Sequence, residues 1–156
     1  MENKNYNATL TVSQTANEVF KHINSVSNWW MENLEGDSEN LNDVFTVDFG
    51  DNNFVTHKLI EVIPNKKVVW LVTYSQLNFV KNKSEWTGTK INFEIEQKGK
   101  QTQMKFTHSG LVPAFECFQD CSNAWSEYIQ QSLLSLITTG KGQPTPKEGK
   151  AKATKK

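Results

Sequence analysis

The sequence contains no arginine, because all 17 of its basic residues are lysines. Arginine carries the planar, two-pronged guanidinium that usually recognises phosphate groups and base edges. Its absence argues against nucleic acid as a partner of the body of the protein. The lysines are also unevenly placed. Six lysines and one glutamate follow Thr139, a net charge of +5, whereas eleven lysines and sixteen acidic residues give the preceding chain −5.

Long hydrophobic runs are absent too. The longest uninterrupted apolar stretch is Val68–Val72, far short of the ~20 residues that a membrane helix needs. Residues Met1–Asn5 do not contain the apolar segment of a secretory signal. We therefore expect a cytoplasmic protein with no membrane partner.

Cysteine is scarce. Cys117 and Cys121 are too few for a disulfide scaffold, and their spacing would place both sulfurs on one face at the start of a helix. With His108 nearby in the sequence, a zinc site or a redox pair is an alternative to simple packing. Zinc usually takes four ligands, however, and His22 and His57 belong to other segments. We interpret the cysteines as packing thiols and predict no metal and no cofactor.

The C-terminal segment differs in composition from the rest of the chain. Gly140–Lys156 is rich in glycine, proline and lysine and has no apolar periodicity, which is typical of a disordered segment. We expect residues 1–140 to form one domain, the usual size for a chain of this length, and residues 141–156 to form a disordered lysine-rich tail. A weak contact of this tail with nucleic acid remains an alternative to a solvated tail.

The remaining chain shows clear periodic patterns. Tyr6–Ser13 alternates between apolar and polar residues, as in a strand. Thr15 and Glu18 have the spacing of a capping box and predict the start of a short helix. A second short helix is expected over Asn28–Leu34, followed by a polar loop. Several alternating segments then predict an antiparallel meander: Phe45–Phe49, Phe54–Ile63, Val68–Tyr74, Ile91–Ile95 and Met104–His108.

The clearest signal is an apolar stripe near the C-terminus. Its members recur with the spacing of one helical face over more than three turns: Trp125, Tyr128, Ile129, Leu133, Leu136 and Ile137. Gly140 stands where a helix cap belongs. The predicted fold class is α+β, in the order strand, two short helices, several strands and one long helix.

This order and several local segments resemble the helix-grip (SRPBCC, START-related) superfamily. The segments are Glu61–Pro64 with Val69–Trp70, Glu85–Thr89 and Phe106–Pro113, together with Trp125. Within the superfamily the chain resembles the bacterial branch similar to the activator of the 90-kDa heat-shock chaperone ATPase. The resemblance implies a curved antiparallel sheet wrapped around the long C-terminal helix. It implies no shared catalytic motif.

A sheet that grips one helix often leaves space for a ligand between them. We predict that this cavity is lined by residues of the helix stripe, the strands and the tryptophan pair: Trp29, Trp30, Phe45, Trp70, Tyr74, Phe93, Phe106, His108, Trp125, Tyr128, Ile129, Ser132 and Leu133. His108 could orient a polar ligand group or act as a base, or be a hydrogen-bonded core histidine. Ser132 could anchor a ligand or bond its own helix. Which face of its strand His57 occupies stays open.

Three functions follow from these observations. The first is binding or carrying an apolar or aromatic small molecule. The alternative, which depends on the resemblance alone, is a co-chaperone-like interaction with a chaperone protein. The second alternative is an enzyme of cyclase or hydrolase type, but no paired carboxylates, catalytic triad spacing or phosphate loop supports it, and we predict no catalytic residue.

Overall fold

A computed structural model of the protein describes residues 5–50, 52–78, 81, 83–112, 116 and 118–145. The elements, in chain order, are β1 (Tyr6–Val12), α1 (Ala16–Asn24), a 3₁₀ turn (Val26–Asn28), β2 (Leu34–Gly36), β3 (Val44–Gly50), β4 (Asn53–Ile63), β5 (Lys67–Gln76), β6 (Lys90–Lys98), β7 (Gln101–Ser109), α2 (Phe118–Glu127), a π-helical segment (Tyr128–Leu133) and α3 (Leu134–Thr139).

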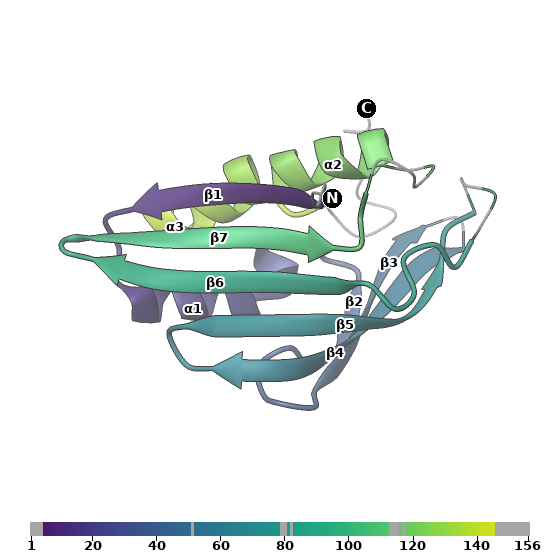
Figure 1. Cartoon of the computed structure of the whole chain (residues 1–156), viewed down its shortest axis with the longest axis horizontal. Coiled ribbons are helices and arrows are strands. Elements are labelled where there is room, and N and C mark those ends of the chain that lie inside the picture. Colours follow the sequence, from purple (N-terminus) through teal and green to yellow (C-terminus); the bar gives the residue numbers. More distant parts are fainter. Residues whose placement is uncertain are drawn as a thin grey trace.

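The strands form one antiparallel sheet in the order β1-β7-β6-β5-β4-β3-β2. The sheet bends, and the helices lie against one of its faces (Figure 1). Alternating residues of each strand therefore point into the space between sheet and helices. The predicted α+β helix-grip architecture is confirmed.

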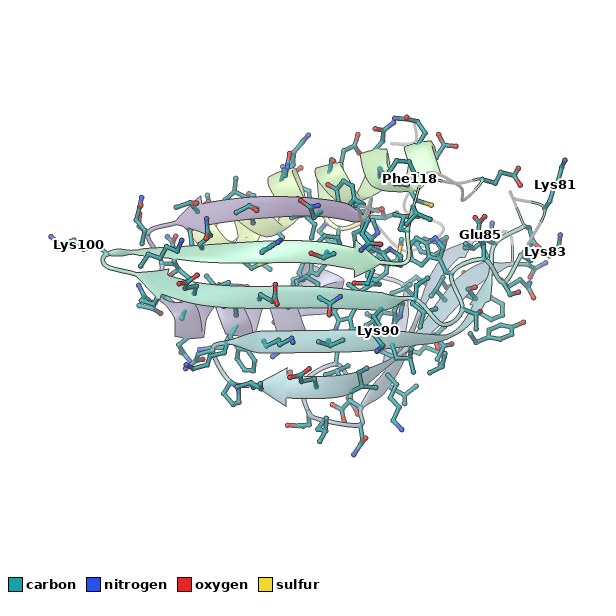
Figure 2. The ribbon with its side chains drawn as sticks, viewed as in Figure 1. Lys81, Lys83, Glu85, Lys90, Lys100 and Phe118 are labelled. Carbon is teal, nitrogen blue, oxygen red and sulfur yellow. The ribbon has the colours of Figure 1, made fainter. Side chains whose placement is uncertain are left out.

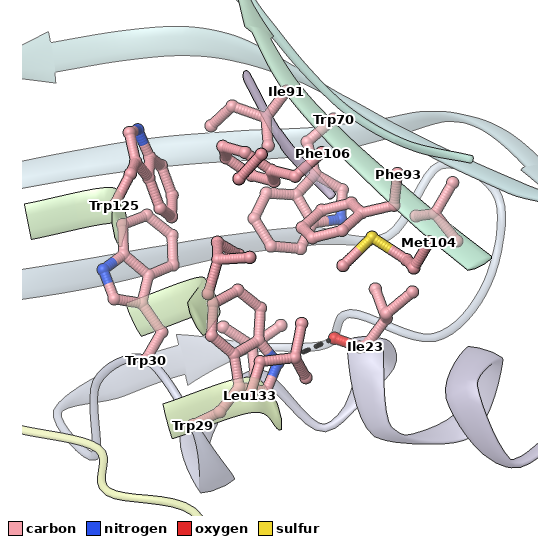
Figure 3. Packing of buried hydrophobic residues seen from close by; sticks show 14 of the residues in the cluster. Ile23, Trp29, Trp30, Trp70, Ile91, Phe93, Met104, Phe106, Trp125 and Leu133 are labelled. Carbon is pink, nitrogen blue, oxygen red and sulfur yellow. Dashed lines mark hydrogen bonds between the residues drawn. The ribbon is translucent and has the colours of Figure 1, made fainter. Parts of the chain in front are cut away.

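The core fills most of the space inside the grip. The rings of Trp29, Trp70 and Phe93 lie within 4.9–6.4 Å of one another, and Leu133 of the last helix packs beside them (Figure 3). The indole nitrogen of Trp29 donates a hydrogen bond to the carbonyl of Ile23. This contact satisfies a polar atom that burial would otherwise leave without a partner.

The N-terminal helix begins as expected. The Thr15 hydroxyl accepts from the Glu18 amide at 3.2 Å, and the Glu18 carboxylate accepts from the Thr15 amide at 3.0 Å. The second short helix predicted over Asn28–Leu34 is wrong in position and length. It is replaced by the single 3₁₀ turn at Val26–Asn28, after which Trp29 and Trp30 turn inward and β2 begins at Leu34.

The last helix runs from Phe118 to Thr139 and includes a π-helical segment between α2 and α3. The apolar stripe faces the sheet as predicted, with Trp125, Ile129 and Leu133 buried. Gly140 ends the helix with a φ of 87°, a left-handed conformation that suits glycine. Among the described residues no helix is long and apolar enough to cross a membrane.

The chain does not leave the domain at Gly140. The Thr145 amide donates to the Trp30 carbonyl, the Glu32 amide donates to the Thr145 carbonyl, and Thr145 pairs with Met31. We call residues 141–145 the C-terminal strap. The expectation of disorder is therefore wrong for these residues, which are held by backbone hydrogen bonds that no apolar periodicity signals. Residues 146–156 lie outside the described part of the chain.

Candidate functional site

A pocket of about 340 Å³ opens at one end of the grip, between the last helix and the ends of β3–β5. Its lining is mostly aromatic and apolar: Trp30, Phe49, Asn53, Leu77, Trp86, Asp120, Cys121, Ala124, Trp125 and Tyr128. This size and composition are typical of small-molecule sites. A second hollow, over β6 and β7, is lined by Glu94, Ile95, Glu96, Gln103 and Lys105 and has no aromatic wall.

Three tryptophans from different elements form the apolar wall of the pocket. Trp30 follows the 3₁₀ turn, Trp86 comes from the β5–β6 connection, and Trp125 lies on α2. The rings of Trp86 and Trp125 are nearly parallel, with centroids 6.0 Å apart, and those of Trp30 and Trp125 are 4.8 Å apart. Such contacts between aromatic rings are favourable, and together the three rings form the apolar side of the pocket.

A buried hydrogen-bond chain fixes two of these tryptophans. The Thr89 hydroxyl donates to the Trp86 carbonyl at 2.6 Å, so it accepts from Nε2 of His108 at 2.8 Å. Nδ1 of His108 then accepts from the Trp125 indole at 3.0 Å. His108 is therefore neutral and protonated on Nε2, and burial lowers its pKa to about 3. It positions the pocket wall and has no nitrogen left for a ligand.

The rim of the pocket carries its polar groups. Asp120 is exposed on the first turn of α2, and Oδ1 of Asn53 accepts from the Asn78 amide at 2.6 Å. Lys81, Lys83 and Glu85 project from the β5–β6 connection on the same side of the molecule as Phe118 (Figure 2). The pocket thus has an apolar interior and a polar, charged entrance.

The strap supports the back of this wall. The Tyr128 hydroxyl lies 2.6 Å from that of Thr145. The Ser132 hydroxyl donates to the Trp29 carbonyl at 2.6 Å and accepts from the Gln143 amide at 2.7 Å. Burial raises the pKa of Tyr128, and this effect is larger than the lowering by the hydrogen bond to Thr145. The expectation that Ser132 bonds its own helix is therefore wrong, because it bonds two distant segments, and it is not among the residues that line the pocket.

The predicted cavity residues divide into distinct groups. Trp30, Trp125 and Tyr128 line the pocket. The following are fully or almost fully buried in the packed core: Trp29, Phe45, Trp70, Phe93, Phe106, Ile129 and Leu133. Tyr74 is 47% exposed on the outer face of the sheet, where it stacks on Phe54. Its expected inward position is wrong because β4 and β5 pair with a register shift at Thr56/His57, and the strand faces change at such an irregularity.

His57 faces inward, which the sequence left undecided. It is fully buried between Phe45, with ring centroids 4.6 Å apart, and the edges of Trp30 and Trp70 at 5.4 and 5.5 Å. A second register shift separates it from Glu61, which is partly exposed. Burial lowers the pKa of His57 to about 3, and the weaker opposing effect comes from the backbone of Phe45.

The interpretation of the cysteines as packing thiols is wrong for Cys121. Its side chain is 8% exposed at the pocket wall, and its sulfur is disulfide-bonded. Cys117 lies outside the described residues. Within the described part of the chain, no three His, Cys, Asp or Glu side chains lie close enough together to hold a metal ion.

No protein-family model and no curated protein matches the sequence. Solved structures do match. The Aha1 dimer from Colwellia psychrerythraea has a TM-score of 0.72 and 23% identity, covering 88% of this chain and 98% of the other. This chain has the helix-grip fold. DynU16, a protein in the dynemicin biosynthetic locus, has a TM-score of 0.66 and 15% identity, covering 90% of this chain and 49% of its own. CalU16 from Micromonospora echinospora has a TM-score of 0.62 and 12% identity, covering 86% of this chain and 76% of its own.

These matches confirm the predicted helix-grip fold, and an Aha1 homologue is among the proteins with a similar structure. At such identities they show the fold and leave the function to be argued from the site. Several residues line the pocket that the sequence had not predicted there, and the fold brings them together: Phe49, Asn53, Leu77, Trp86, Asp120, Cys121 and Ala124. Most of them come from strand ends, a loop and the first turns of α2, where no periodic pattern marks an inward face. Three lie in features that the sequence pattern had marked for other reasons: Phe49 in the alternating segment Phe45–Phe49, Trp86 within Glu85–Thr89, and Cys121 of the cysteine pair.

Proposed function

We propose that this helix-grip chain binds a small apolar or aromatic molecule in the pocket at the open end of the grip. The observation that carries the proposal is the wall of Trp30, Trp86 and Trp125 around about 340 Å³ of space with a polar rim. Burial of a flat apolar ligand against such a wall gains free energy from every apolar surface removed from water. The lining contains one carboxylate, Asp120, and no histidine, so the proposal assigns no catalytic residue.

Filling the pocket from its rim tests this proposal. Ala124 is exposed and lines the entrance, whereas its neighbour Asn123 is exposed and does not. Ala124→Phe should place a ring in the pocket, while Asn123→Phe adds the same ring beside it. The wild type and Asn123→Phe are then expected to gain melting temperature from a panel of aromatic compounds, and Ala124→Phe to gain none. Equal gains in all three proteins, or none in any, would contradict the proposal.

Native mass spectrometry of freshly purified protein gives an independent test. A small molecule that co-purifies with the wild type and with Asn123→Phe, but not with Ala124→Phe, would support the proposed function. Its mass would also define the ligand class.

The alternative is a protein-interaction role, and the similarity to the Aha1 homologue favours it. If the chain acts in this way, it should retain a chaperone of the 90-kDa heat-shock type from its own cell extract. Ala124→Phe should change that retention no more than Asn123→Phe does, because both add one ring at an exposed position and only the first fills the pocket. The response to Ala124→Phe therefore distinguishes the two roles.

A further inference from the structure

Among the described residues, two neighbouring side chains of the core carry fully buried nitrogens without a hydrogen-bond partner. His57 on β4 and Trp70 on β5 both have an exposed fraction of 0%, and their ring centroids lie 5.5 Å apart. Neither ring nitrogen of His57 nor the indole nitrogen of Trp70 forms a hydrogen bond of ordinary geometry with the described residues. The Phe45 backbone interacts with the His57 ring only weakly, because its hydrogen-bonding effect on the His57 pKa is smaller than that of burial. Together the two side chains place three poorly satisfied nitrogens in one part of the interior.

Packing alone does not explain a histidine at this position. The ring of Phe45 stacks on it at an interplanar angle of 14°, and Trp30 and Trp70 meet it edge-on. Phenylalanine would keep these contacts without burying two nitrogens. Buried polar groups in native proteins are nearly always bonded, and an unpaired one lowers stability. His108 shows the usual arrangement, with both nitrogens bonded.

The two side chains lie one side chain away from the pocket. Trp30 lines the pocket and also packs against His57 and Trp70, with ring centroids at 5.4 and 6.0 Å. Along β4, Asn53 lines the pocket, and Val55 and His57 continue the inward row. The strand thus leads from the pocket directly to His57, behind the indole of Trp30.

We propose that His57 and Trp70 form a polar subsite at the inner end of the pocket, and that it binds a neutral hydroxyl or carbonyl group of an aromatic ligand when the Trp30 side chain moves aside. This inference depends on the proposed function. The Trp70 indole can donate to the ligand oxygen, and the unprotonated nitrogen of His57 can accept from a ligand hydroxyl. Burial lowers the pKa of His57 to about 3, so the ring has no charge to compensate a buried carboxylate.

A matched ligand pair tests the subsite. 2-Naphthol and 2-methylnaphthalene have nearly the same shape, but the first carries a hydroxyl group where the second carries a methyl group. Calorimetric titration at pH 7 should give about tenfold tighter binding of 2-naphthol, equivalent to about 1.4 kcal/mol. In an NMR spectrum of the indole N–H groups, the Trp70 signal, assigned by its loss in Trp70→Phe, should shift with 2-naphthol and much less with 2-methylnaphthalene.

Variants locate the effect. His57→Phe should bind 2-methylnaphthalene as the wild type does but lose the preference for 2-naphthol, to within about twofold. Trp70→Phe should weaken the preference in the same direction and serves if His57→Phe does not fold. The control is Ser75→Ala on β5, because the Ser75 hydroxyl is buried but already bonded to Thr87 at 2.9 Å. This control should keep the full preference.

The outcomes separate this inference from the proposed function. Equal affinity for both ligands, with an unmoved Trp70 signal, would overturn the polar subsite and leave the proposed function standing. A preference for 2-naphthol that persists in both His57→Phe and Trp70→Phe would also overturn it. If neither ligand binds the wild type, the subsite and the proposed function fall together.

Discussion

The two buried histidines should make the protein sensitive to mild acid. His57 and His108 are both fully buried, and burial lowers the pKa of each from 6.5 to about 3. The nearby His57 lowers the pKa of His108 further. The folded state therefore keeps both rings neutral at a pH where the unfolded chain protonates them. Below pH 6.5 the unfolded state binds more protons, so stability falls as the pH falls towards 3.

The size of the effect follows from these values. Between pH 7 and pH 5 each histidine should remove about 2 kcal/mol from the free energy of unfolding. The pair should therefore remove about 4 kcal/mol, a large part of the 5–15 kcal/mol typical of a domain. His22 has a pKa lowered chiefly by burial as well, so it acts in the same direction.

Urea unfolding at pH 7, 6 and 5 measures this loss. His57→Phe should halve the loss between pH 7 and 5, to about 2 kcal/mol, and should leave stability at pH 7 equal or higher, because it removes nitrogens without partners. His108→Phe should also halve the loss but lower stability at pH 7, because it leaves the Trp125 indole unpaired. A wild type whose stability is unchanged between pH 7 and 5 would refute the reasoning.

Three further changes test the packing around the pocket. Leu133→Ala should cost about 2–5 kcal/mol in urea unfolding, because Leu133 lies in the filled core and not at a cavity wall; a loss below about 1 kcal/mol would show that space exists there. Thr89→Val should cost about 1–3 kcal/mol by leaving His108 without its acceptor, and an unchanged midpoint would exclude that bond. Gly142→Ala should release the strap, because a Cβ atom there would lie 2.2 Å from the Asn28 carbonyl oxygen. Hydrogen–deuterium exchange should then speed up at the Thr145 amide, whereas deletion of residues 146–156 should leave that amide protected. Equal protection in Gly142→Ala would contradict the docked strap.

The elements of the fold could be read from the sequence where a local pattern repeats. The stripe from Trp125 to Ile137 predicted the last helix, and the capping box at Thr15 and Glu18 predicted the start of α1. In both, the interacting residues lie within a few positions of each other. The alternation along the strands likewise fixed the antiparallel meander, because a strand that is half buried repeats every two residues.

The site depended on contacts that no local pattern contains. Two register shifts in the β4–β5 pair decided that His57 points inward and Tyr74 outward, and a shift of one residue exchanges the faces of a strand. The hydroxyl of Ser132 bonds the carbonyl of Trp29, 103 positions away in the sequence. The sequence determined most of the residues that are buried, with Tyr74 and His57 as exceptions. Only the tertiary structure decided which of the buried residues fill the core, which line the pocket, and which buried nitrogens have no partner. Burial depends on residue type, whereas partners depend on which distant segments the folded sheet brings together.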